Sequence, residues 1–258
     1  ALKPDVVFVT NPSSKHIEVA LLSAKAKANI FIEKPISHNK EGVEELQALT
    51  HKNNLVVRVG YQTRYHPCYK VVQSVFAEGR YGNLISAGFE WGTYLPDHHP
   101  YEDYRDGYAA NSSLGGGVTL GLIHEIDLIY SFFGIPKTVA AIGGKLSSLE
   151  MTADDTVSVL MGFEMAGRLI PVNLFLSYAQ KHETRTFRMQ FEEALLVCDL
   201  IINSVVCYGS KGKILFQKEY GILDRNQIFK AEMLEFIDAV KRQDTSGNSL
   251  RNAAETLS

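Results

Sequence analysis

The sequence has few cysteines, little charge imbalance and no uninterrupted apolar run, and each of these absences argues against a class of protein. Its three cysteines, Cys68, Cys198 and Cys207, are odd in number and lack paired spacing, which indicates reduced thiols of a cytoplasmic protein rather than a disulfide framework or a zinc site. The formal net charge of -3 provides no basic stripe for nucleic acid or an anionic membrane. Polar groups interrupt the most apolar stretches, 117–135 and 195–208, so we predict neither a membrane span nor a signal peptide.

The first sixty residues alternate between two patterns. Three short runs of apolar and β-branched residues, 5–10, 29–33 and 55–60, are typical of strands buried on both faces. The segments between them, 13–27 and 39–53, place apolar residues at helical spacing. This order of strand, helix, strand, helix and strand predicts a parallel sheet with right-handed crossovers.

The pattern changes near residue 62, where we expect a domain boundary. Helical patterns at 67–77 and 118–133 precede a series of strand-like runs between residues 138 and 217. Within that series, Phe187, Met189 and Phe191 alternate with polar residues, as on a strand with one buried and one wet face. These runs predict an antiparallel or mixed sheet.

The two halves together predict a protein of α/β and α+β class. Residues 1–62 form part of a parallel-sheet domain, and residues 63–258 form a domain with a large, open, mostly antiparallel sheet covered by helices. A last helix at 227–241 has one apolar side and could cover part of either sheet.

Lys34 follows the second predicted strand directly, in the run Glu33-Lys34-Pro35. Ligands of doubly wound sheets bind at the carboxyl ends of parallel strands. A lysine shielded from water there has a lowered ammonium pKa and can exchange a proton with a substrate hydroxyl. Pro35 fixes the local backbone and stiffens the turn. An isolated Glu-Lys-Pro is more often a surface turn, so the assignment depends on the other motifs.

A second polar group follows three consecutive glycines, Gly115 to Gly117. His124 and Asp127 lie three residues apart on one face of the predicted helix, so Asp127 can orient His124, which titrates near neutral pH. A hydrogen-bonded core histidine is the more frequent case. Glu125 and Asp127 beside His124 could indicate a metal, but no second His or Cys at ligand spacing supports one, and we predict no metal site.

Two further segments have the composition of a ligand site. Residues 60–67 lie at the expected domain junction, where Arg64 could bind an anionic or polyhydroxyl group; a plain linker fits equally well. The loop at 94–112 mixes aromatic rings with hydrogen-bonding groups, including Tyr94, Tyr104 and Arg105. Long loops in compact domains are more often functional than idle, which favours contact with a sugar-like substrate.

Taken in order, these motifs resemble the Gfo/Idh/MocA oxidoreductases, the glucose-fructose oxidoreductase and inositol dehydrogenase type. The resemblance rests on Thr10-Asn11-Pro12, Glu33-Lys34-Pro35, the 60–67 run and the triple glycine with His124 and Asp127. It implies that residues 1–62 are the C-terminal half of a Rossmann domain and that the enzyme uses NAD or NADP to oxidise or reduce CH–OH groups. The implied substrates are sugars, inositols or nucleotide-linked sugars, and the implied assembly is a homodimer or homotetramer.

The resemblance also implies roles for individual residues, to which the two ligand-like segments add the substrate contacts. The predicted set is Lys34 and His124 for proton transfer; Asn11, Pro12, Glu33, Lys34 and Gln62 for the cofactor; and Arg64, Tyr94, Tyr104, Arg105 and Asp127 for the substrate.

Two departures from the family pattern affect this expectation. The G-x-G-x-x-G turn that binds the pyrophosphate is absent from the chain. The first predicted strand would then have an unpaired edge, and we expect the chain to be part of a longer protein. Gly121 stands where many relatives carry an aspartate. A ligand-binding or regulatory relative without activity, and an NAD-assisted glycosidase on the same scaffold, are the alternatives.

Overall fold

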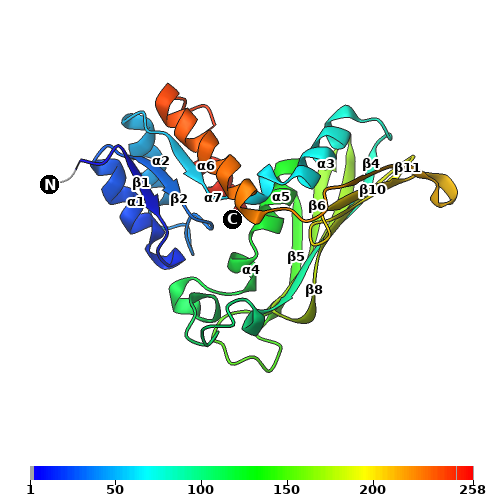
Figure 1. The fold of residues 1–258 in the computed structure, drawn as a ribbon, viewed down its shortest axis with the longest axis horizontal. Coiled ribbons are helices and arrows are strands. Elements are labelled where there is room, and N and C mark those ends of the chain that lie inside the picture. The colour runs from blue at the N-terminus through cyan, green and yellow to red at the C-terminus, as the bar shows by residue number, and fades with distance from the viewer. Residues whose placement is uncertain (1–2, 248, 258) are drawn as a thin grey trace.

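The computed structural model describes residues 3–247 and 249–257 and arranges them around two separate sheets (Figure 1). The first sheet is parallel and has the order β1-β2-β3, so β1 lies at its edge. Two helices make the crossovers, as the alternation of patterns predicted. The bounds are Val6–Val9 for β1, His16–Lys25 for α1, Asn29–Ile32 for β2, Val43–Lys52 for α2 and Val57–Val59 for β3.

The second sheet has eight strands in the order β11-β10-β9-β8-β4-β7-β6-β5. Strands β4 and β7 pair in parallel and the other neighbours are antiparallel, so the prediction of a mostly antiparallel sheet is confirmed. The bounds are Leu84–Tyr94 for β4, Thr138–Gly144 for β5, Thr156–Met165 for β6, Arg168–Ser177 for β7, Ala179–Phe191 for β8, Leu195–Asp199 for β9, Ser204–Tyr208 for β10 and Ile214–Glu219 for β11.

Aromatic side chains pack the helices α3 (Pro67–Glu78) and α5 (His124–Phe133) onto one face of this sheet. Phe187 of β8 stacks on Phe89 of β4 with ring centroids 5.1 Å apart, and Phe132 of α5 contacts Phe187. Phe187, Met189 and Phe191 are all buried, as their alternation predicted. Burial of these large apolar surfaces stabilises the face and holds α5 on it.

The helix predicted over 118–133 is broken into α4 (Val118–Gly121) and α5, and the prediction of one continuous helix is wrong. Leu122 leaves helical geometry, and the Glu125 N–H donates to the Leu122 carbonyl instead of the Gly121 carbonyl one turn earlier. The Gly121 carbonyl is therefore available to another donor, which is the Lys34 side chain.

The two C-terminal helices, α6 (Arg225–Arg242) and α7 (Leu250–Thr256), return to the parallel sheet. In Figure 1 α6 lies in the half of the molecule that contains the parallel sheet, and α7 contacts β3 and α2. Phe236 of α6 packs on Phe31 of β2, while Leu250 of α7 joins the core of the same sheet. The sequence left open which sheet the last helix covers, and the packing resolves this in favour of the first. The division at residue 62 remains our proposal for the boundary before α3.

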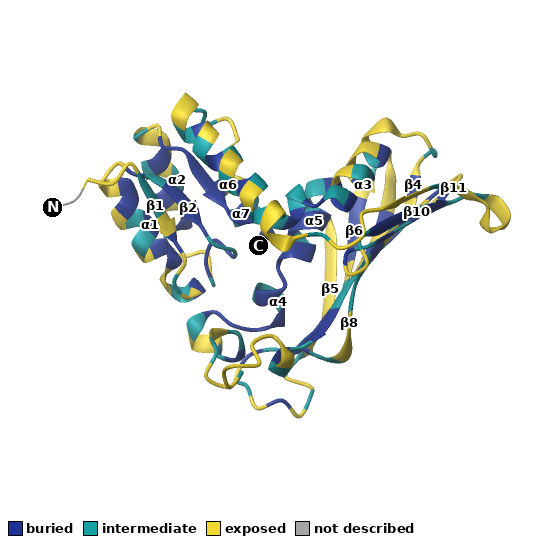
Figure 2. Ribbon diagram, viewed as in Figure 1, coloured by how far each residue is buried: buried dark blue, intermediate teal, exposed yellow. Residues whose placement is uncertain are grey.

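Burial follows this arrangement: the sheet cores are buried, whereas β5 is exposed along most of its length (Figure 2). Within the part of the chain that the structure describes, no helix is both long enough and apolar enough to cross a membrane.

Candidate functional site

Lys34 lies just beyond the carboxyl end of β2, and its Nζ donates to the Gly121 carbonyl oxygen at 2.9 Å. Burial lowers the pKa of Lys34; Glu33 opposes this shift and Arg185 adds to it. An amine with a lowered pKa gives up and regains a proton more readily at neutral pH. The predicted position of Lys34 at the edge of the parallel sheet is confirmed.

His16 of α1 joins the loops that follow β1 and β2. Its two ring nitrogens lie 2.7 Å from the Asn11 carbonyl oxygen and 2.7 Å from the Pro35 carbonyl oxygen. Both partners are backbone carbonyls, which can only accept, so the ring donates through a nitrogen that carries a proton. This buried histidine holds the segment of Asn11 against the turn of Lys34, a connection that sequence reasoning did not find.

His124 is buried at the start of α5, and its Nδ1 has no hydrogen-bond partner among the described residues. Burial lowers the pKa of His124 well below its usual value, and the positive charges of Lys34 and Arg185 add to this shift. The imidazole is therefore neutral near pH 7. Its ring lies 6.4 Å from that of Trp91, between centroids, beside the cavities described below.

Asp127 does not orient His124, contrary to the sequence prediction. Both of its carboxylate oxygens accept hydrogen bonds from Arg64, each at 2.7 Å, in a bidentate ion pair. The arginine reaches Asp127 from the turn after β3, a contact between distant segments that helical spacing alone does not reveal. Neither side chain lines the two cavities near Lys34, so their predicted role in substrate binding has no support from their position.

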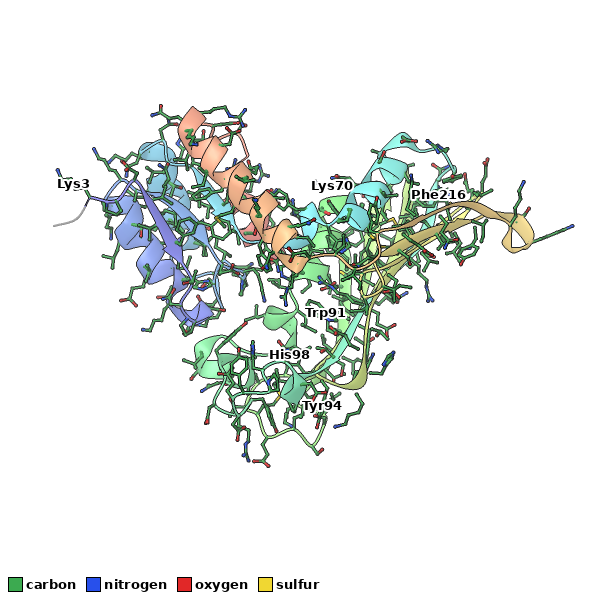
Figure 3. All side chains as sticks on the ribbon, in the orientation of Figure 1. Lys3, Lys70, Trp91, Tyr94, His98 and Phe216 are labelled. Atoms are coloured by element: carbon green, nitrogen blue, oxygen red, sulfur yellow. The ribbon has the colours of Figure 1, made fainter. Side chains whose placement is uncertain are left out.

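Two cavities of about 740 and 370 Å³ meet at Lys34. Trp91, Glu183 and Arg225 line both of them. The larger cavity is walled by the loop after β4, and Figure 3 shows Trp91, Tyr94 and His98 gathered there. The predicted residues divide between them: Tyr94 and Tyr104 line the larger cavity, and Gln62 and His124 line the smaller one.

The remaining predicted residues lie apart from these cavity walls. Arg105 is exposed and binds Asp103 and Glu150, so its predicted contact with substrate is not what the structure shows. Asn11, Pro12 and Glu33 occupy the loops at the carboxyl edge of the parallel sheet, which is where a dinucleotide would lie.

Buried polar atoms without partners mark this edge as a place for a ligand. The side-chain oxygens Asn11 Oδ1 and Gln62 Oε1 are buried and accept no hydrogen bond from the described residues. Leaving a buried acceptor unpaired costs about 1–3 kcal/mol. Hydroxyl or amide donors of a nucleotide would satisfy both oxygens, so the residues present fit a nicotinamide cofactor.

Residues 69–214 match the family described as GFO/IDH/MocA C-terminal domain, and residues 1–61 match the oxidoreductase family with an NAD-binding Rossmann fold. The chain belongs to the Gfo/Idh/MocA oxidoreductase family.

Relatives within the Gfo/Idh/MocA family include named dehydrogenases. The chain is 27% identical to the uncharacterized oxidoreductase YrbE of Bacillus subtilis over 167 residues, which are 62% of this chain and 46% of that protein. It is 27% identical to trans-1,2-dihydrobenzene-1,2-diol dehydrogenase of Bos taurus over 161 residues, 62% of this chain and 45% of that one. The chain thus spans about half the length of the curated relatives it matches.

Solved structures of similar fold cover nearly all of the chain. Levoglucosan dehydrogenase in complex with NADH and levoglucosan superposes with a TM-score of 0.82 at 17% identity, covering 98% of this chain and 75% of that one. UDP-N-acetylglucosamine 3-dehydrogenase GnnA from Acidithiobacillus ferrooxidans gives a TM-score of 0.75 at 20% identity, with 98% and 75% covered. These likenesses establish the Gfo/Idh/MocA fold.

Several residues of this Gfo/Idh/MocA site were missed by sequence reasoning. They share a position on the cavity walls, and they are Trp91, Tyr178, Lys181, Glu183, Arg185 and Arg225. The sequence could have indicated Arg185, because alternate residues of a strand share a face and Arg185 therefore lies on the same side of β8 as Phe187 and Met189. A charged residue on that buried face is unusual. It donates to Glu125 at 2.6 Å and stacks over Trp91 at 3.8 Å from the ring centroid.

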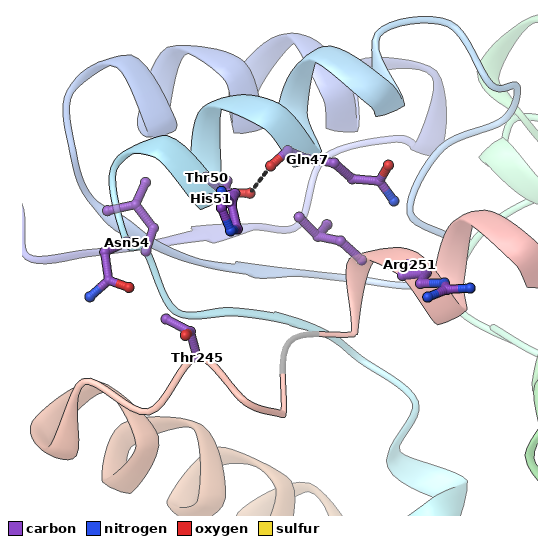
Figure 4. Close-up of a pocket in the computed structure, with 8 residues that line it drawn as sticks. Gln47, Thr50, His51, Asn54, Thr245 and Arg251 are labelled. Atoms are coloured by element: carbon purple, nitrogen blue, oxygen red, sulfur yellow. Dashed lines mark hydrogen bonds between the residues drawn. The ribbon is translucent and has the colours of Figure 1, made fainter.

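A third hollow of about 580 Å³ lies between α2 and the segment around α7 (Figure 4). Gln47, Thr50 and Arg251 are among its lining residues, and it shares none with the two cavities at Lys34. Across the described ranges no cluster of His, Cys, Asp and Glu has the arrangement needed to hold a metal ion.

Proposed function

We propose that the protein is an NAD- or NADP-dependent dehydrogenase that acts on a CH–OH group of a sugar, inositol or nucleotide-linked sugar. The observation that carries the proposal is Lys34. Its amine has a lowered pKa, sits at the carboxyl edge of the NAD-binding half-domain, and faces two cavities that also contain His124 and Tyr94. The names of relatives, which include a diol dehydrogenase and levoglucosan dehydrogenase, support this substrate class.

The proton of the substrate hydroxyl passes to Lys34 in the oxidative direction. The O–H bond breaks, its electron pair forms the carbonyl, and the C–H bond on the same carbon breaks to release a hydride. A nicotinamide ring bound at this edge supplies the acceptor for that hydride. The neutral imidazole of His124 is placed to exchange the proton further or to bind the substrate oxygen.

The residues proposed to hold the cofactor follow from the unpaired acceptors. Asn11 and Gln62 present buried amide oxygens, and Glu33 lies beside Lys34. Carboxylate and amide oxygens accept hydrogen bonds from ribose hydroxyls and carboxamide groups. The aromatic and polar loop at 94–112 forms the wall of the larger cavity through Tyr94 and Tyr104, which we assign to the substrate.

The test is Lys34→Ala, with Lys40→Ala as control because Lys40 is exposed in the same connection after β2. We expect Lys34→Ala to lower turnover of the best sugar or polyol substrate by at least about a hundredfold. NADH binding should remain close to normal. It can be followed by energy transfer from Trp91, which lines both cavities and is the sole tryptophan of these 258 residues. Full turnover in Lys34→Ala would show that Lys34 is not the proton-transfer residue.

A further inference from the structure

Tyr178 follows β7 and is held in place from three sides. Its N–H donates to the Asp155 carbonyl at 2.8 Å, and its own carbonyl accepts from the Leu95 N–H at 2.9 Å. The edge of its ring meets the ring of His98 with centroids 5.7 Å apart. The side chain is only 2% exposed, yet it lines the larger cavity together with Lys34. A side chain fixed in this way presents its hydroxyl at one defined point.

The Tyr178 hydroxyl occupies the space of a missing side chain at position 121. A Cβ placed on Gly121 would lie 1.7 Å from the Tyr178 hydroxyl oxygen, far inside van der Waals contact. The carbonyl of the same Gly121 accepts the hydrogen bond of Lys34 Nζ. The phenol and the amine therefore converge on a single residue at the wall of the cavity.

The hydroxyl is available to a ligand. Tyr178 lines the larger cavity, and its hydroxyl forms no hydrogen bond with the described residues, although the hydroxyl of a buried tyrosine usually has a partner. Burial raises the pKa of Tyr178, so the phenol keeps its proton and acts as a donor. Lys34, whose pKa is lowered, is the proton acceptor beside it. The phenol can donate a hydrogen bond to the same substrate oxygen from which the amine accepts a proton.

We propose that Tyr178 is a substrate-contacting residue whose hydroxyl donates a hydrogen bond to the substrate oxygen that exchanges its proton with Lys34. This inference rests on the proposed function for the identity of that oxygen. The hydrogen bond fixes the oxygen against Gly121 and orients the carbinol carbon. Position 121 must remain glycine, because any larger residue would displace the hydroxyl that makes this contact.

The geometry can be tested by stability measurements, without any activity. Gly121→Ala is expected to lower the melting temperature when Tyr178 is present, because the new methyl group meets the phenol oxygen. In a Tyr178→Phe background that oxygen is gone, and the same substitution should cost clearly less. An equal cost in both backgrounds would show that the hydroxyl does not fill this space and would overturn the proposal.

The second test measures the activity of Tyr178→Phe. We expect kcat/KM to fall about tenfold or more because this hydrogen bond is lost. NADH binding, measured by energy transfer from Trp91, should be unchanged. Tyr69→Phe is the matched control: Tyr69 is also 2% exposed, but its hydroxyl donates to Ser131 away from the cavities. It should keep its activity within about threefold.

The outcomes separate the two proposals. Normal kcat/KM in Tyr178→Phe, with Lys34→Ala inactive, overturns the role of Tyr178 and leaves the dehydrogenase assignment standing. Wild-type protein without turnover on any sugar or polyol overturns both, even if Gly121 and Tyr178 remain coupled in stability. A tenfold loss confined to Tyr178→Phe supports the contact with substrate.

Discussion

Asp127 and Glu125 lie two residues apart near the start of α5, and each is buried against an arginine from a different element. Arg64, 29% exposed, pairs with Asp127, 1% exposed. Arg185, 16% exposed, pairs with Glu125, 3% exposed. Burial raises the pKa of both carboxyl groups and the arginines oppose that shift. The two pairs hold the first turn of α5, and His124 with it, between the sheet and the domain junction.

Replacing Asp127 by Asn tests whether this pair is structural. Arg64 would keep its charge in a largely buried place without a counter-ion, so the free energy of unfolding should fall by on the order of 2–4 kcal/mol. Chemical denaturation measures this. Asp238→Asn is the control, because Asp238 pairs with Arg242 on the surface of α6 and its removal should cost under about 1 kcal/mol. Unchanged stability with loss of substrate affinity would restore the sequence-based role of Asp127.

Glu232 of α6 makes stability depend on pH. It is 3% exposed, and burial raises the pKa of its carboxyl to about 8, with Glu33 and Asp127 adding to the shift. The folded protein thus binds this proton more tightly than the unfolded chain does. Its contribution to stability is complete below the unfolded pKa, about 4.3, and is lost as pH rises toward 8.

Glu232→Gln should remove this dependence. The melting temperature of the variant is expected to equal that of the wild type near pH 4 and to exceed it increasingly up to pH 9, where the difference corresponds to on the order of 1–3 kcal/mol. Differential scanning calorimetry across this range measures it. Exposed Glu44→Gln provides the reference. A constant difference between pH 4 and pH 9 would mean that Glu232 does not titrate in this window.

Elements were predictable from the sequence where one local pattern decided the outcome. The βαβαβ order and the alternation along β8 are local, and both were predicted. The break between α4 and α5 was not, because residues 118–133 keep a helical pattern throughout and the carbonyl of Gly121 is bound by Lys34, 87 residues away in the sequence. Non-local hydrogen bonds of this kind leave no periodic signal.

The site was predictable to a similar extent. Lys34 and His124 were placed by motifs that follow a strand or open a helix, and the structure brings both to the cavities. The partners of Arg64 and the position of Tyr178 depend on tertiary packing between segments that the sequence does not relate. Arg105, in contrast, has suitable chemistry but satisfies its charges locally with Asp103, two residues away.

Helix α6 offers a test of which sheet it belongs to. Phe236 is fully buried against Phe31 and Phe8, so Phe236→Ala should lower the free energy of unfolding by about 3–5 kcal/mol. Hydrogen exchange should then quicken first in β1, β2 and α6, while β6 and β7 remain protected. Leu234→Ala, exposed on the same helix, should cost under about 1 kcal/mol. Uniform loss of protection across both sheets would contradict this assignment of α6 to the first sheet.

At the scale of the whole molecule, the eight-stranded sheet has one covered face and one apolar region that no described element covers. The strand registers put Ile142, Leu160 and Leu169 on the same outer face of β5, β6 and β7, and they are 84%, 51% and 59% exposed. The face turns polar toward β8, where Arg188 and Gln190 are exposed. Exposed apolar patches with a polar rim are typical of interfaces between proteins.

We predict that a second copy of the chain covers this region, giving a homodimer or a homotetramer. A two-fold axis pairs a surface with itself, and the patch on β5–β7 is apolar enough to be self-complementary.

The double variant Ile142→Lys, Leu160→Lys would bring like charges together in that interface. It should therefore shift the mass measured by light scattering toward the monomer without lowering the melting temperature of the monomer. Ile222→Lys, a fully exposed isoleucine outside the patch, is the control. A wild-type protein that is monomeric at micromolar concentration, or a double variant that keeps the wild-type mass, would contradict the prediction. The outer face of β5–β7 would then be free in solution.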